Sequence, residues 1–146
     1  NGYYYWDVRP LQSDEIVATR TQARESVIGL LYAYDLGNEA IANHIDVIFE
    51  DKKIRNKQKE FAITLFDGVV KNIDACDEQI VSHLDKRGID DLGIVEKSIL
   101  RLAIYEILFS SLDKPIIINE AIELTKRLAS DNAPRFINGL LDKINK

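Results

Sequence analysis

The sequence has little of what most catalytic and metal-binding sites need. Its 146 residues include one cysteine, two histidines far apart and seven scattered glycines. One cysteine and two distant histidines cannot form a structural zinc site, and the glycines form no phosphate-binding loop. There is also no nucleophile elbow and no Ser-His-Asp or Cys-His pattern. These absences favour a binding protein over an enzyme. We expect such a protein to need neither a cofactor nor a metal.

Paired cysteines, long apolar runs and excess positive charge are also lacking. The lone Cys76 excludes an internal disulfide framework and fits a reducing, cytoplasmic location. We find neither a signal-peptide pattern nor an apolar run long enough to span a bilayer. The net charge of −5 argues against a protein that holds nucleic acid by bulk electrostatics. Any nucleic-acid role therefore requires a local basic patch or charge supplied by a partner.

The segment 95–109 is apolar nearly all round when it is drawn as a helix. At about 100° per residue, only a narrow polar strip interrupts it, made of Glu96, Lys97, Ser98 and Arg101. A helix of this kind is normally buried. We therefore expect it to be the central helix of a bundle, with other helices packed on most of its sides.

Glu106 is the residue that does not fit this helix. It falls on the apolar face, beside Val95, Ile99 and Leu102. A buried carboxylate is costly unless it is paired or hydrogen-bonded. We expect a structural pair with an arginine or with a helix N-terminus. A catalytic acid is the less favoured alternative, because no second acid-base group accompanies it in a recognisable motif.

The rest of the chain also shows helical periodicity, and no segment shows sustained β alternation. The predicted further helices cover 20–36, 39–49, 56–71, 74–86, a segment from 115 or 119 to about 129, and one from 134 towards the end. The fold class is therefore all-α, a single-domain bundle of about seven helices over residues 18–146. Residues 1–17, which open with a stretch at 1–6 that is aromatic without helical spacing, are set aside as a non-native or disordered leader. A native extension is the alternative.

Three side chains of the first helix, and one near the start of the last, are candidates for an RNA surface. Arg20 and Arg24 lie one turn apart at the edge of an apolar stripe, and Tyr32 points to the polar side. Guanidinium groups bind phosphates and an exposed ring offers a stacking surface. The alternative is an ordinary solvated face. Phe136 lies at the edge of an apolar face, as core or as a partly exposed platform.

Four stretches together resemble the NusB family of bacterial transcription antitermination factors. They are RTQARE at 20–25 with LLY at 30–32, GIVEKSILRLAIYE at 93–106, INEAIELTK at 118–126 and FINGLLDK at 136–143. With the helices that link them they cover residues 18–146. The last three stretches, in this order and at this spacing, are highly specific.

The resemblance implies an all-helical fold of two packed halves with three to four helices each. It implies binding to the boxA element in the leader of ribosomal RNA transcripts. It also implies a heterodimer with NusE, a small-subunit ribosomal protein that doubles as a transcription factor. Such a pair joins the RNA polymerase antitermination complex and promotes read-through of terminators.

The resemblance also assigns roles to residues of this chain. Arg20, Arg24, Tyr32 and Phe136 match the RNA-contacting positions of the family, and Glu96 matches a position used for the ribosomal-protein partner. The family often has a denser arginine run in the opening helix, where residues 21–22 here are Thr-Gln. We therefore expect weak RNA binding by the chain alone and tighter binding with the partner.

Two other functions fit the same residues. One is an RNA-binding domain of the kind that is fused to RNA methyltransferases. The other is a protein–protein adaptor that contacts no RNA. The sequence leaves open whether the chain is a monomer or a homodimer, and which RNA sequence it prefers.

Overall fold

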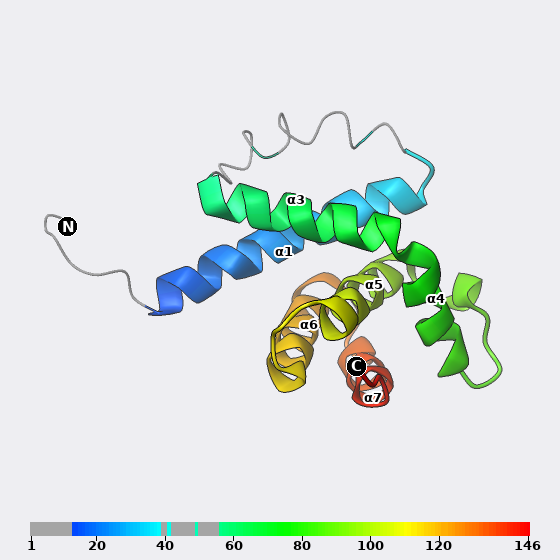
Figure 1. Ribbon diagram of the computed structural model, residues 1–146. Coiled ribbons are helices and arrows are strands. Elements are labelled where there is room, and N and C mark those ends of the chain that lie inside the picture. Colours follow the sequence, from blue (N-terminus) through cyan, green and yellow to red (C-terminus); the bar gives the residue numbers. More distant parts are fainter. Residues whose placement is uncertain (1–12, 39–40, 42–48, 50–55) are drawn as a thin grey trace, which may run out of the picture.

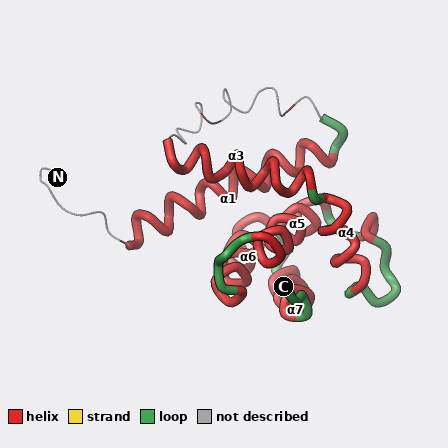
Figure 2. The backbone as a smooth tube through the Cα atoms, viewed as in Figure 1, coloured by secondary structure: helices red, strands yellow, loops and turns green. Residues whose placement is uncertain are grey.

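Every regular element of the described chain is helical (Figure 2). The computed structural model describes residues 13–38, 41, 49 and 56–146, with side chains from Arg20 onward, Asn56 excepted. In chain order the elements are α1 Ser13–Asp35, α3 Asn56–Lys71, α4 Ile73–Ser82, a short 3-10 turn η2 Ile89–Asp91, α5 Ile94–Phe109, α6 Lys114–Leu128 and α7 Ala133–Asp142. No strand occurs in these ranges, so the predicted all-α class is confirmed.

The helices are arranged around α5. In Figure 1, α1 and α3 lie side by side on one side of α5, α6 and α7 lie on the other, and α4 flanks it. All five of these helices pack directly against α5. The prediction of a central helix covered on most sides is confirmed.

The polar strip predicted on α5 is mostly buried as well. Lys97 and Arg101 are 8% and 6% exposed, and Ser98 is fully buried. Of the four strip residues only Glu96 is half-exposed. The covering elements, α4 and the end of α1, bring carboxylates to the two cations, and these pairs make the burial possible.

Two predictions concern the first 55 residues. Helix α1 begins at Ser13, earlier than the predicted position 20 and inside the segment 1–17 that was set aside. The helix predicted at 39–49 lies outside the described residues, apart from Ile41 and Phe49. Phe49 is fully buried and Ile41 packs against the core.

The other helix bounds follow local chemistry. Helix α3 has the predicted bounds, whereas α4 ends at Ser82, before the predicted 86. The Ser82 hydroxyl and the His83 ring both hydrogen-bond to the Gln79 carbonyl oxygen, at 3.0 and 2.9 Å. Such side-chain bonds compete with the helical ladder. Helix α6 starts with Pro115 in its first turn, the earlier of the two predicted starts.

Helices α3 and α5 approach closely at Gly68. A Cβ atom at this position would overlap the ring of Tyr105, which projects from α5. The Gly68 carbonyl oxygen also accepts a hydrogen bond from the Asn72 side chain at 2.8 Å. The missing side chain of Gly68 therefore allows α3 to lie against the central helix.

Within the described residues, no helix is both long enough and apolar enough to cross a membrane. The same part of the chain holds no group of three or more histidine, cysteine or carboxylate side chains that could bind a metal ion.

Candidate functional site

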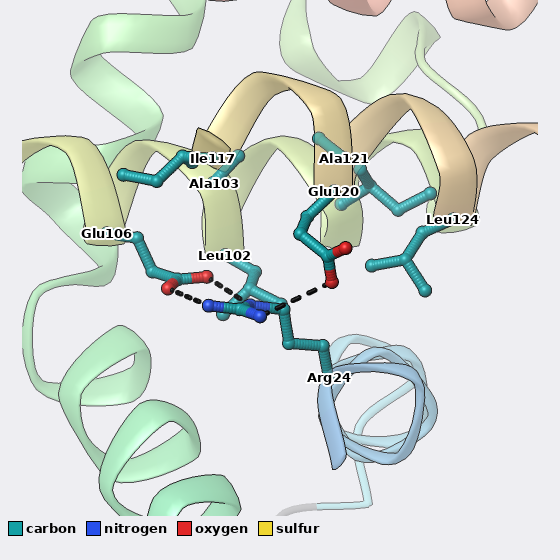
Figure 3. Close-up of a pocket in the computed structure, with 9 residues that line it drawn as sticks. Arg24, Leu102, Ala103, Glu106, Ile117, Glu120, Ala121 and Leu124 are labelled. Atoms are coloured by element: carbon teal, nitrogen blue, oxygen red, sulfur yellow. Dashed lines mark hydrogen bonds and ion pairs between the residues drawn. The ribbon is translucent and has the colours of Figure 1, made fainter. Parts of the chain in front are cut away.

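Arg24 lies in a buried ion cluster where α1 meets α5 and α6 (Figure 3). Its Nε and Nη2 donate to the two carboxylate oxygens of Glu106 at 2.9 and 2.8 Å, and Nη1 donates to Glu120 at 3.3 Å. Arg24 is 4% exposed and Glu106 is 2% exposed. Such a two-pronged pair is the strongest geometry for arginine and a carboxylate. The predicted pairing of Glu106 with an arginine is therefore confirmed.

The surroundings of this cluster keep Arg24 charged and leave no room for a ligand. Burial alone would lower the pKa of Arg24, but the hydrogen bonds and charge of Glu106, followed by those of Glu120, outweigh burial and raise this pKa. Thr21 donates a further hydrogen bond to Glu120 at 3.0 Å. The free space between these helices is about 10 Å³, room for about one water molecule.

The position of Arg24 corrects the prediction made for it. The sequence placed Arg24 at the edge of the apolar stripe, as a direct RNA contact. In the structure its guanidinium faces inward and donates hydrogen bonds to two carboxylates. An RNA phosphate would have to break the buried pair to reach it. Arg24 instead fixes α1 against α5 and α6.

Arg20, one turn earlier, is the arginine that α1 presents to solvent. Its guanidinium carbon lies 4.7 Å from the centre of the Phe61 ring on α3, while that of Arg24 lies 5.0 Å from the same ring centre. Arg20 is exposed and makes no ion pair with any described residue. A cation held over a ring keeps its charge available while its position is restrained. Arg20 is therefore suited to bind an anion.

A second ion cluster ties α5 to α1 and α4. Arg101 donates to Asp77 at 2.7 and 2.8 Å and to Asp35 at 2.8 Å, and Lys97 lies 3.0 Å from Asp35. Burial alone would raise the pKa of Asp35, but the hydrogen bonds from Lys97 and Arg101 outweigh it and lower this pKa. As in the Arg24 cluster, the cations here are paired with carboxylates of the same chain.

Tyr32 lies in a partly apolar cleft of about 250 Å³. The cleft is formed by α1, the start of α5 and the end of α6, and its lining residues are Glu25, Ile28, Gly29, Tyr32, Val95 and Leu128. Tyr32 is 40% exposed. A Cβ atom at Gly29 would meet nothing within 4 Å, so the glycine leaves open space there. The cleft therefore offers an accessible ring and apolar walls.

Glu96 follows Val95, which lines this cleft. It is half-exposed and lies in the first turn of α5, where its carboxylate folds over Gly93. Negative charge is favourable at a helix N-terminus. Glu96 makes no ion pair with any residue of the described chain. Glu96 itself is not among the residues that line the cleft of Tyr32.

Phe136 faces a different cleft, also of about 250 Å³, between the end of α4 and α7. We call this the α4–α7 cleft, and its lining residues are His83, Leu84, Asp85, Arg87, Arg135, Phe136, Gly139, Leu140 and Lys143. Phe136 is half-buried and packs against the core. The Arg87 guanidinium carbon lies 4.7 Å from the centre of its ring. Phe136 thus combines the two predicted alternatives, because it packs against the core and also lines the cleft.

Sequence reasoning missed three of the residues that line the α4–α7 cleft, namely Arg87, Arg135 and Lys143. Part of the signal was present, because Arg135 and Gly139 are one turn apart on α7, and Lys143 follows one turn later as the residue that caps the end of this helix. Arg87 follows α4 in a turn, where no periodicity indicates which helix it meets. The structure also places the candidate residues on two different helices with different neighbours. Helix α1, with three of them, packs on α3, α5 and α6, whereas α7, with Phe136, packs on α5 and α6.

Comparison with known proteins identifies the family. The model described as "NusB family" matches residues 21–146, which is most of the chain. The chain belongs to the NusB family. The resemblance noted in the sequence is therefore confirmed.

Individual NusB relatives agree with this assignment. The "Transcription antitermination protein NusB" of Aliarcobacter butzleri is 71% identical over 130 residues, covering 89% of this chain and 99% of the relative. The solved structure "T. maritima NusB, P3121, Form 2" is 31% identical with a TM-score of 0.78, covering 85% of this chain and 88% of that one.

A third similar protein was solved with its partners. Its structure is titled "Crystal Structure of Antitermination Factors NusB and NusE in complex with dsRNA". That NusB is 34% identical to this chain with a TM-score of 0.76, covering 86% of this chain and 94% of that one. The helical arrangement described above is therefore the NusB fold.

Proposed function

We propose that this chain is an RNA-binding transcription antitermination factor that acts as a heterodimer with the ribosomal protein NusE on boxA leader RNA. Membership in the NusB family is the observation that carries this proposal. A protein of the same fold is described in complex with NusE and RNA. We expect a cytoplasmic binding protein that promotes read-through by RNA polymerase, with no catalytic activity of its own.

Two separate surfaces support a protein that binds RNA and a partner together. The exposed guanidinium of Arg20 is held over the Phe61 ring and makes no ion pair with a carboxylate of the described residues. Farther along α1, Tyr32 and Gly29 line a cleft with Val95, and Glu96 follows Val95 in the first turn of α5. We assign Arg20 and Phe136 to RNA, and Glu96 to the partner.

Tyr32 changes its assignment in this proposal. The sequence suggested RNA contact, but its ring lines the cleft beside Val95. Apolar walls with an accessible tyrosine are typical of the centre of a protein interface. We therefore propose that Tyr32 contacts NusE, and that its replacement by alanine weakens RNA binding only when NusE is present.

The test is an anisotropy titration of labelled boxA leader RNA at two salt concentrations, with the chain alone and then with NusE. We expect weak binding by the chain alone, tighter binding with NusE, and affinity that falls as salt rises. Absence of RNA binding in both titrations would overturn the proposal.

The alternative of a pure adaptor is favoured by one observation, the net charge of −5. Calorimetry with NusE separates the two functions. NusE binding without any salt-dependent RNA binding by the heterodimer would support the adaptor. The charge reversal Glu96→Lys should weaken the calorimetric NusE signal, and an undiminished signal would remove Glu96 from the interface.

A further inference from the structure

We propose that Phe61 on α3 is a positioning residue for RNA binding, which acts by restraining the guanidinium of Arg20 on α1. The ring itself makes no contact with RNA; it acts through the arginine. This inference rests on the proposed RNA-binding function and deepens it, because it adds a residue of a second helix that determines how well the RNA-contacting arginine is placed.

The small number of cations on α1 is the first argument. This helix contains two basic residues, Arg20 and Arg24. The Arg24 guanidinium is buried and paired with Glu106 and Glu120, so of the two only Arg20 remains for an external anion. A long side chain loses conformational freedom when a ligand fixes it, and this loss lowers affinity. Restraint of Arg20 before the RNA arrives therefore strengthens binding.

The contact between the arginine and the ring is the second argument. The Arg20 guanidinium carbon lies 4.7 Å from the centre of the Phe61 ring, while the side chain of Arg20 stays exposed. An aromatic ring attracts a cation without neutralising it. Unlike a carboxylate, it also does not use up the N–H groups with which a guanidinium binds phosphate in a two-pronged manner. The ring therefore restrains Arg20 and leaves its charge and donors available.

The rigidity of the support is the third argument. Phe61 is half-buried and packs against the hydrophobic core, and α3 packs on α1. The Arg24 guanidinium carbon lies 5.0 Å from the same ring centre. Because Glu106 and Glu120 balance the charge of Arg24, this second cation does not repel Arg20 as an unpaired one would. The fold therefore supplies a fixed ring to which a surface arginine can attach.

The experiment titrates labelled single-stranded boxA leader RNA with the NusE heterodimer over a salt series. Phe61→Leu removes the ring but keeps an apolar side chain. RNA affinity should fall about three- to tenfold, with an unchanged slope of log K against log salt, because the charge of Arg20 remains. Arg20→Gln should lower the affinity and also reduce this slope by about 0.7. In the Arg20→Gln background, Phe61→Leu should cause no further loss, since two residues that act as one unit are not additive.

Two further variants separate positioning from a general loss of structure. Phe61→Tyr keeps an aromatic ring and should restore wild-type RNA affinity. Phe66→Leu is the matched control, because it makes the same change on the same helix at a buried ring that packs edge-on against Tyr34. It should lower the urea midpoint of unfolding, while the RNA affinity of the folded heterodimer stays at the wild-type value.

The outcomes separate this proposal from the function on which it rests. If Phe61→Leu weakens RNA binding equally with and without Arg20, or if Phe66→Leu weakens it as much, the positioning role is wrong. If Arg20→Gln binds RNA with wild-type affinity and salt slope, Arg20 makes no contact to be positioned and the inference is wrong, although the function stands. If the wild-type heterodimer binds no RNA at all, the proposed function itself fails.

Discussion

Two arginines of this molecule lie over phenylalanine rings at nearly the same distance, yet their surroundings differ. Arg24 lies 5.0 Å from the centre of Phe61, and Arg87 lies 4.7 Å from the centre of Phe136. Arg24 is 4% exposed, and its guanidinium is paired with two carboxylates. Arg87 is exposed and has no ion pair with the described residues.

The comparison shows that a cation over a ring does not by itself reveal the role of an arginine. What distinguishes the two is how the charge is balanced. A buried guanidinium with Glu106 and Glu120 is neutralised within the fold and holds helices together. An exposed guanidinium without a carboxylate keeps its charge for an external anion. Substitution of a buried, paired arginine should therefore change stability, whereas substitution of an exposed, unpaired arginine should change RNA binding.

The largest expected effect is that of Arg24→Ala on stability. The change leaves the Glu106 carboxylate buried without its partner, which typically costs about 3–5 kcal/mol. Urea unfolding should show this loss as a lower midpoint with a similar slope. RNA affinity of the fraction that stays folded should remain near that of the wild type. Wild-type stability together with lost RNA binding would restore Arg24 as a direct contact.

The double variant Arg24→Met with Glu106→Leu is the control for this prediction. It removes both charges and leaves apolar side chains of similar volume. Replacement of a buried pair in this way is often neutral or stabilising. We expect the double variant to be more stable than Arg24→Ala. A double variant as unstable as the single one would show that packing, not the unpaired charge, causes the loss.

The next effect is that of Asp35→Asn, which weakens the second ion cluster. Hydrogen bonds to charged groups contribute about 1.5–3 kcal/mol each, so we expect a loss of about that size at neutral pH. The pKa of Asp35 is lowered in the folded chain from its ordinary 3.8. Its contribution is therefore complete above about pH 3.8 and is lost as pH falls through the lower folded value.

Thermal unfolding of wild type and Asp35→Asn over a pH series checks this. The difference between the two should be constant at neutral pH and shrink as pH drops below 3.8. Asp67→Asn, at an exposed position on α3, is the control and should follow the wild type throughout. A difference that grows on acidification would contradict the lowered pKa of Asp35.

A smaller effect is expected for Gly139→Ala in the α4–α7 cleft. Alanine is a better helix former than glycine by about 1 kcal/mol, and a Cβ atom there meets nothing. The variant should be more stable in urea by up to this amount, with unchanged RNA affinity. A loss of stability would mean that this face of α7 is covered in solution.

The smallest effect on stability is that of Arg87→Gln. The side chain is exposed and makes no ion pair with the described residues, so the free energy of unfolding should change by no more than about 0.5 kcal/mol. Heterodimer affinity for RNA should nevertheless fall. A loss of stability comparable to that of Arg24→Ala would remove the distinction between the two arginines.

Much of the fold could be predicted from the sequence, because it depends on local pattern. The apolar run of α5 indicated a central helix, and Glu106 within it required a counter-charge. The identity of that counter-charge could not be predicted, because Arg24 lies 82 positions away in the chain and meets Glu106 only through helix packing. For the same reason an arginine at the edge of a stripe was read as exposed.

The candidate site was less predictable, for a related physical reason. Tyr32 was a candidate from its helical spacing and Glu96 from the resemblance, but the cleft that Tyr32 lines with Val95 depends on how α1 meets the start of α5. The spacing of Arg135 and Lys143 can be read from the sequence. Their meeting with Arg87 depends on where α4 ends, and the hydrogen bonds of Ser82 and His83 decide that end.

A substitution at Gly68, inside the helix packing, can affect a surface residue far from it. A Cβ atom there would overlap the Tyr105 ring, so either this ring or α3 would have to shift. Helix α3 also carries Phe61, the ring that supports Arg20. A genetic selection for failed antitermination should therefore recover Gly68 substitutions, although this glycine touches no ligand. Second-site suppressors should arise at Tyr105, where a smaller side chain would restore the space between the helices.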